Sequence, residues 1–182
     1  MAPKDFLRGL SSDELEVVQH VHRLAARIDV DSLSEEGALN LVLPPAAQVD
    51  LNHDGLTQSG AGYGVRFPDS NTPADVAAAW DEATAGLSLR EKMTYELQMV
   101  LPILLANIHT DDTGAFSHRV EPGEPGYVNP LADADYSYAE AIQDQLGGLE
   151  FAFSRGHVSK EAYDRRHAFW STFQRTLDEH QR

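Results

Sequence analysis

The chain has 182 residues, of which 29 are acidic and 14 basic, and its formal net charge is −15. So acidic a surface repels phosphate backbones, which argues against a nucleic-acid partner and suits a cation or a basic protein partner. Cysteine is absent, which excludes disulfides, thiolate zinc sites and cysteine nucleophiles, while 42% hydrophobic residues suffice for a buried core.

The first residues, MAPKDFLRGLSSDEL, lack the apolar core of a signal peptide. We therefore expect a cytoplasmic protein if the chain begins here naturally, and a periplasmic or secreted one if a signal peptide has been removed. Ser11 and Glu14 fit a capping box, and apolar residues follow at helical spacing. This pattern predicts a helix over 11–29.

The segment after this helix is rich in turn formers. Residues 37–45 fit either a short helix or an extended segment, and Pro44-Pro45 ends it in both cases. Residues 46–71 then lack regular periodicity. Their interspersed Leu, Val, Tyr and Phe indicate an ordered irregular segment, and a segment of this length in a compact domain is usually functional or disordered.

The most specific pattern in the chain, Asp50-Leu-Asn52-His-Asp54-Gly55, lies in this segment. Oxygen-bearing side chains at positions one, three and five, followed by glycine at six, resemble the first half of an EF-hand calcium loop. Alternate side chains then point to one centre, and glycine permits a left-handed turn. The resemblance implies calcium as the cofactor, with five ligands: Asp50, Asn52, Asp54, the Leu56 carbonyl and Gln58.

The loop departs from the EF-hand pattern at position twelve, where Ala61 stands in place of a bidentate glutamate. A carboxylate from elsewhere must complete the ligand set, or calcium will bind weakly. The candidates are Asp69, Asp75, Asp111, Asp112, Asp133 and Asp135. A metal-free turn is the alternative, because Asp and Asn side chains also stabilise turns through local backbone hydrogen bonds. The pairs at 111–112 and 133–135 could bind a second ion or complete the first, but such pairs are more often helix caps and solvated loops.

Two helices are predicted over 73–108. Thr72 caps the first, with Pro73 at its first position, and Ser88 with Glu91 fits a second capping box. Pro102 is expected to bend or break the second helix. Its apolar stripe comprises Leu89, Met93, Leu97, Val100, Leu104 and Ile108. No run reaches the roughly 18 apolar residues of a membrane span, so none is predicted.

Residues 109–134 are predicted to form a loop, and residues 137–180 a helical hairpin. Its helices begin at Ser137 and Ser159, and Gly156 is expected to be left-handed between them. Within it, five residues resemble the short hairpin of bacterial SHOCT modules: Gly156, Val158, Ser159, Glu161 and Tyr163. The resemblance implies a bacterial protein and carries no function.

Catalytic motifs are not recognisable, because the chain has no nucleophile elbow, S-x-x-K, Walker or dinucleotide glycine pattern. No catalytic residue is assigned, and the pattern favours a non-enzyme. The sequence predicts a single all-α domain over 1–182, a bundle of about five helices with an irregular segment carrying the loop. Three functions stay open: a helical protein with a structural calcium ion, an acidic interaction protein without metal, and a metal-assisted hydrolase.

Overall fold

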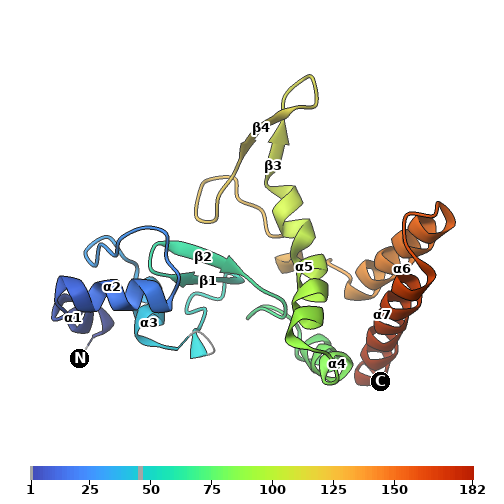
Figure 1. Ribbon diagram of the computed structural model, residues 1–182, viewed down its shortest axis with the longest axis horizontal. Coiled ribbons are helices and arrows are strands. Elements are labelled where there is room, and N and C mark those ends of the chain that lie inside the picture. The colour runs from blue at the N-terminus through green and yellow to red at the C-terminus, as the bar shows by residue number, and fades with distance from the viewer. Residues whose placement is uncertain (1, 45–46) are drawn as a thin grey trace. The chain divides into compact units, whose positions relative to one another are not determined.

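The computed structural model describes residues 2–44 and 47–182. Pro45 and Ala46, where two of the predicted segments end and begin, lie outside the described residues. Contacts divide the chain into two compact units (Figure 1). The first unit comprises Met1–Ser70 and Val120–Tyr127, and the second comprises Asn71–Arg119 and Val128–Arg182. The single domain over 1–182 stays a prediction.

The first unit begins with three helices: α1 (Pro3–Arg8), α2 (Ser12–Val21) and α3 (Glu35–Val42). An antiparallel hairpin follows, made of β1 (Leu56–Ser59) and β2 (Gly62–Val65). The helices enclose a small aliphatic core whose buried members are Leu7, Val30, Leu33, Ala38 and Leu41. This core is short of aromatic residues, so much of the unit depends on polar contacts.

Helix α2 begins as predicted and ends earlier than predicted. The capping box of Ser11 and Glu14 is present, which confirms the helix start. The helix ends at Val21 instead of residue 29, because Arg23 adopts a left-handed φ of 55° and the Leu24 N–H donates to the Gln19 carbonyl. The chain thereby turns back and still packs Leu24 and Ile28 against the core.

Helix α3 approaches the β1–β2 turn through two glycines. The Gly60 N–H donates to the Gly37 carbonyl at 3.0 Å. A Cβ on Gly37 would lie 2.2 Å from the Gly60 carbonyl oxygen, so only glycine allows this approach. The segment 37–45, for which a helix and an extended segment were both predicted, is therefore helical up to Val42. Its Gly37 contacts the turn of the hairpin.

The second unit contains four longer helices: α4 (Ala74–Thr84), α5 (Leu89–Ala106), α6 (Tyr138–Ser154) and α7 (Lys160–His180). The capping box of Ser88 and Glu91 is confirmed, as are the N-caps at Ser137 and Ser159. Helix α4 starts one residue later than predicted, since Pro73 is its N-cap. Helix α5 continues through Pro102 without a break.

Short elements occupy the predicted loop over 109–134. They are an antiparallel hairpin of β3 (Ile108–Thr110) and β4 (Phe116–Arg119), and a 3₁₀ turn, η2 (Pro130–Ala132). Gly114 turns the hairpin with a left-handed φ of 81°. The protein is therefore mostly helical, and the all-α prediction is wrong because it left out two hairpins, whose strands are too short to show a clear alternation.

Helix α7 is the centre of the second unit, where it packs along α4 and α6. Buried aromatic rings of α4 and α5 contact those of α7. Trp80 of α4 lies edge-on to Phe169 and Phe173, with ring centroids 5.8 and 5.3 Å apart. Tyr95 of α5 stacks on Phe169, with ring centroids 3.6 Å apart. Trp170 is buried beside them. Aromatic burial of this kind contributes most of the apolar stabilisation available to such a unit.

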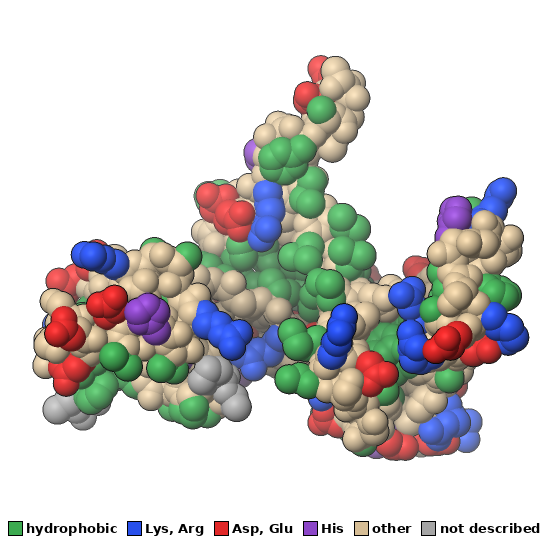
Figure 2. Space-filling view, viewed as in Figure 1, with side chains coloured by type: hydrophobic (Ala, Val, Ile, Leu, Met, Phe, Trp, Pro, Cys, Tyr) green, Lys and Arg blue, Asp and Glu red, His purple; other side chains and the backbone are tan. Residues whose placement is uncertain are grey.

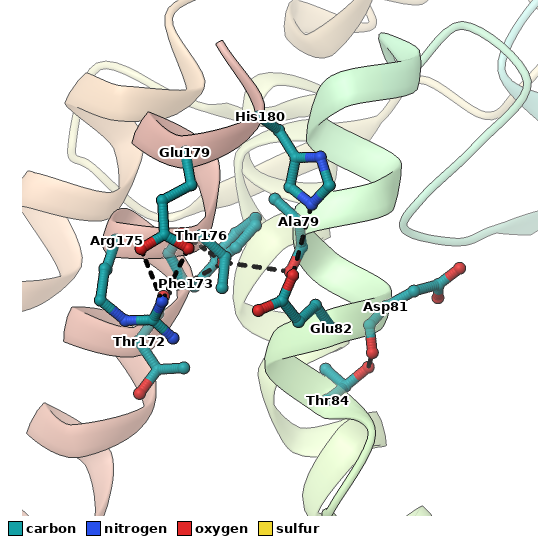
Figure 3. A network of polar contacts seen from close by, with 10 residues as sticks. All are labelled: Ala79, Asp81, Glu82, Thr84, Thr172, Phe173, Arg175, Thr176, Glu179 and His180. Carbon is teal, nitrogen blue, oxygen red and sulfur yellow. Dashed lines mark hydrogen bonds and ion pairs between the residues drawn. The ribbon is translucent and has the colours of Figure 1, made fainter. Parts of the chain in front are cut away.

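Polar contacts also join α4 to α7, as Figure 3 shows. The buried Thr176 hydroxyl donates to the Ala79 carbonyl at 3.2 Å, and His180 approaches Glu82 at 3.4 Å. Arg175 pairs with Glu179 one turn along α7 itself. The Thr176 hydroxyl also lies 3.1 and 3.0 Å from the Thr172 and Phe173 carbonyls of its own helix, so the contact with Ala79 adds to its hydrogen bonding within α7.

The described helices include none that is both long enough and apolar enough to cross a membrane.

Candidate functional site

The predicted calcium loop is held at both ends by one buried glutamate on α3. Glu36 accepts the Leu51 N–H at 2.9 Å through one carboxylate oxygen and the Gln58 N–H at 2.6 Å through the other. The side chain is only 7% exposed. Hydrogen bonds to a charged group are stronger than neutral ones, so Glu36 clamps the start and the end of the loop together.

Asn40 makes a second clamp one helical turn along the same face of α3. Its amide nitrogen donates to the carbonyls of Val49 and Gln58, both at 2.7 Å, and its amide oxygen accepts the Val49 N–H at 2.9 Å. The residue is fully buried. Together, Glu36 and Asn40 bring residue 58 next to residues 49–51, which closes residues 50–58 into a ring.

Local hydrogen bonds curl residues 50–55 within this ring. The Asn52 side-chain oxygen accepts the Asp54 N–H at 3.2 Å, and one Asp54 oxygen accepts the Leu56 N–H at 2.8 Å. The Asn52 amide also donates to the other Asp54 oxygen at 2.9 Å. Gly55 has a φ of 80°, the left-handed turn expected at position six. Asn52 and Asp54 therefore already act as turn formers.

Asp50 differs from these two residues because half of its carboxylate is unsatisfied. Its Oδ2 accepts the Gly55 N–H at 2.9 Å and the Ser70 hydroxyl. Its Oδ1 is buried and accepts no hydrogen bond from the described residues. Burial would raise the pKa of Asp50, but hydrogen bonds from the Ser70 hydroxyl and from the backbone of Gly55, His53 and Asp54 together outweigh it and hold the pKa below its usual value. The carboxylate is therefore charged at neutral pH.

Asp50 lines a cavity of about 200 Å³ beside the loop. The other lining residues are mostly oxygen-bearing: Gln48, Gly55, Thr57, Arg66, Pro68, Asp69 and Ser70. A cavity of this size holds an ion with a few waters, and carboxylate, hydroxyl and carbonyl oxygens are the ligands of hard cations. The oxygen-bearing residues of this cavity are thus of the kind that bind hard cations.

Arg66 introduces the opposite charge into this cavity. A guanidinium stays charged at every physiological pH, and it repels a cation in proportion to its proximity. Arg66 is therefore the residue that most directly disfavours the binding of a cation in this cavity.

The structure divides the five predicted ligands into two groups. The curl of the loop brings the Asn52 and Asp54 side chains into contact, whereas Asp50 lines the cavity that contains Asp69. Leu56 is the first residue of β1 and pairs with Val65, and Gln58 lies in the same strand. The Gln58 side-chain oxygen accepts the Ser34 hydroxyl at the start of α3. Gln58 as a ligand stays a prediction, and it would require this hydrogen bond to be exchanged for the ion.

The carboxylates expected to replace position twelve are also divided. Asp69 lines the same cavity as Asp50, whereas the others belong to the second unit. One oxygen of Asp111 accepts the Thr113 N–H, the Thr113 hydroxyl and the Ala115 N–H, which turns the β3–β4 hairpin. One carboxylate oxygen of Asp133 accepts the Asp135 N–H at 3.1 Å. These two residues act as turn formers, and Asp69 is the remaining candidate within the first unit.

Sequence reasoning missed the residues that clamp the loop, Glu36 and Asn40, and cavity residues such as Ser70 and Arg66. A glutamate in the first turn of a helix is normally a solvated partner of the helix dipole, so nothing local marks Glu36 as buried. Ser70 lies 20 residues beyond its partner Asp50. The only available signal was the short spacing of Glu36 and Asn40 on one helix face.

Within residues 2–44 and 47–182, no three histidine or acidic side chains gather as a metal-binding group. The loop prediction does not need one, because it counts an amide and a backbone carbonyl among the ligands. Comparison of the chain with protein-family models, with curated proteins and with solved structures found no match.

Proposed function

We propose that residues 50–58 of the first unit bind one calcium ion, and that this ion has a structural role. The ligands are Asp50, Asn52, Asp54 and the Leu56 carbonyl, with Gln58 after its side chain turns inward. In this proposal, Asp69 supplies the carboxylate missing at position twelve, and water completes the shell. Calcium suits the loop better than magnesium, since it accepts flexible sets of six to eight oxygens.

One observation carries this proposal: the buried Asp50 Oδ1 that accepts no hydrogen bond from the described residues. A charged oxygen removed from water without a partner is costly, and nearly all buried polar atoms in proteins are satisfied. A cation at this oxygen removes the cost. Asn52 and Asp54 do not discriminate between the two alternatives, because their turn hydrogen bonds occur with or without an ion.

The experiment is a thermal melt with millimolar calcium and with a chelator, followed by circular dichroism. Calcium that binds only the folded state stabilises it by about 2.7 kcal/mol at a hundredfold excess over its dissociation constant. We therefore expect a higher midpoint in calcium than in chelator, and a calorimetric stoichiometry of one ion per chain. An equal midpoint in both would remove the proposal.

Asp50→Asn is the informative variant and Asp111→Asn its matched control. Asp50→Asn removes the charge at the unsatisfied oxygen and should abolish the calcium response. Asp111 is also an acidic loop residue with a lowered pKa, caused by hydrogen bonds from Thr113, but it lies in the second unit. Asp111→Asn should therefore leave the response intact. A response that both variants retain would place the ion elsewhere.

The second candidate function is that of an acidic helical interaction protein without metal. It is favoured by one specific observation, namely a row of exposed apolar side chains along α5. In this proposal, α4, α5, α6 and α7 form the helical bundle that displays the row. Asp50→Ala would then have no calcium response to remove.

A further inference from the structure

Helix α5 is apolar on two sides. One side carries its buried residues, Tyr95, Met99, Val100 and Ile103. The other side is exposed, and we call it the α5 outer face. Its five members are between 42% and 76% exposed: Leu89, Met93, Leu97, Leu101 and Leu105. The predicted stripe joined Val100 to Leu89, Met93 and Leu97, and the structure buries Val100 but leaves the other three exposed.

Figure 2 shows apolar side chains gathered over α5 and the base of the β3–β4 hairpin. Ile108 and Phe116 of the hairpin, which follows α5 directly, are also 41% and 67% exposed. A helix that is apolar on two sides is usually buried on both, and a contiguous exposed patch generally marks an interaction site. The α5 outer face therefore lacks a partner among the elements of the second unit.

We infer that the α5 outer face is covered by the same face of a second copy of this chain, with the two helices antiparallel. This deepens the second candidate function by naming its partner, and it does not depend on calcium. Each copy would contribute the same patch about a twofold axis, as in most soluble homodimers.

The size of the patch is the first argument. Five large side chains at these exposures leave on the order of 600 Å² of apolar surface on α5, and the hairpin residues raise it toward the ~800 Å² that each partner gives to a standard interface. The α5 outer face alone would thus supply most of one partner's half of a standard interface.

The charge of α5 favours a second copy of the chain as the partner of this face. The whole chain carries a net charge of −15, yet α5 holds two basic residues, Arg90 and Lys92, and two acidic ones, Glu91 and Glu96. The helix is therefore neutral as a whole. A basic partner would find no excess negative charge there, and anionic lipid would meet an acidic molecule without a cluster of lysines or arginines on the helix. A second copy meets no net like charge at this face.

The orientation follows from the distribution of the same charges. All four lie in the first half of α5, and residues 97–108 contain none. A parallel pair would place Arg90 against Arg90 and Glu96 against Glu96. An antiparallel pair places the charged half of each helix against the uncharged half of the other, with Leu97 near the axis and Leu89 opposite Leu105.

Sedimentation equilibrium of the full chain over a wide concentration range tests the inference. We expect the mass of two chains, with reversible dissociation on dilution, and no change when a chelator replaces calcium. Leu97→Glu should weaken dimerisation at least about tenfold, because it places a charge at the centre of the patch. Phe151→Glu is the control, since Phe151 is 60% exposed on α6 and outside the row. Circular dichroism reports whether both variants fold.

Cross-linking keeps the test decisive even if Leu97→Glu does not fold. The chain contains no cysteine, so single substitutions give unique reactive sites. With a short bis-maleimide, Leu97→Cys should link readily to itself, whereas Leu89→Cys should link to Leu105→Cys and not to itself. The mass of one chain at every concentration, or binding of anionic vesicles that Leu97→Glu abolishes, would overturn the inference. Self-linking of Leu89→Cys would overturn the antiparallel arrangement.

Discussion

Different kinds of interaction stabilise the two units of the chain. In the second unit, large aromatic side chains from three helices meet on α7, and the buried groups are mostly apolar. In the first unit, the aliphatic core is small, and a buried carboxylate and a buried amide on α3 hold a long irregular segment. Apolar burial is insensitive to pH and ions, whereas buried carboxylates depend on both.

This difference indicates where a bound ion matters. A unit with a large aromatic core gains little from an ion, but a unit whose closure depends on one glutamate and one partly satisfied aspartate gains much. The chain offers a way to follow the units separately. Its two tryptophans, Trp80 and Trp170, both lie in the second unit, so their fluorescence reports that unit alone. Amide hydrogen exchange reports both.

Phe173→Ala should have the largest effect on stability. The ring is fully buried against Trp80, and removing a buried phenylalanine costs about 3–5 kcal/mol through lost transfer energy and the cavity left behind. Denaturant unfolding followed by tryptophan fluorescence measures this loss. Phe151→Ala, at an exposed position on α6, should change the midpoint little. Equal effects of the two variants would show that the aromatic core is not what stabilises the second unit.

Glu36→Gln should come next, and its effect should appear in the first unit. The substituted amide keeps one acceptor oxygen but turns an N–H₂ group toward one of the two loop N–H groups, which costs about 1.5–3 kcal/mol for a bond to a charged group. Hydrogen exchange at residues 49–59 should speed up while tryptophan fluorescence stays unchanged. The neighbouring Glu35 is exposed, and Glu35→Gln should have no such effect.

Acid should loosen the first unit before the second. Burial raises the pKa of Asp50, but hydrogen bonds from Ser70 and from the backbone of Gly55, His53 and Asp54 together outweigh it and lower the pKa in the folded state. A lowered pKa gives stability that is present above the unfolded value, about 3.9, and is lost as the pH falls through the folded value. Exchange protection in residues 50–58 should thus decline below about pH 4. Asp50→Asn should flatten that decline, and an unaltered profile would contradict the role of Asp50.

The smallest effect is expected from Arg66→Gln. If calcium enters the cavity beside Asp50, removing the guanidinium should tighten calcium binding by about two- to fivefold at low salt, and less at high salt because ions screen the repulsion. Titration calorimetry at two salt concentrations measures it. Arg27→Gln removes the same charge from an exposed position that does not line this cavity, so it should leave the affinity unchanged. Weaker binding in Arg66→Gln would mean that Arg66 orders the site instead of opposing the ion.

Much of the local structure was predictable because it depends on neighbours in the chain. The capping boxes at Ser11 and Ser88, and the left-handed glycines at 55 and 156, follow from side chains and backbone angles within a few residues. The loop at 50–55 belongs to the same class. Neighbouring Asn, Asp and Gly residues produce its curl, so the curl could be predicted from the sequence.

Tertiary structure alone decided the rest. The burial of Glu36 and Asn40 and the hydrogen bond between Ser70 and Asp50 join residues far apart in the chain. The same holds for α5, whose sequence is apolar on two sides and does not say which one α7 will cover. Periodicity reports that a face is apolar, and burial depends on which surface arrives to cover it.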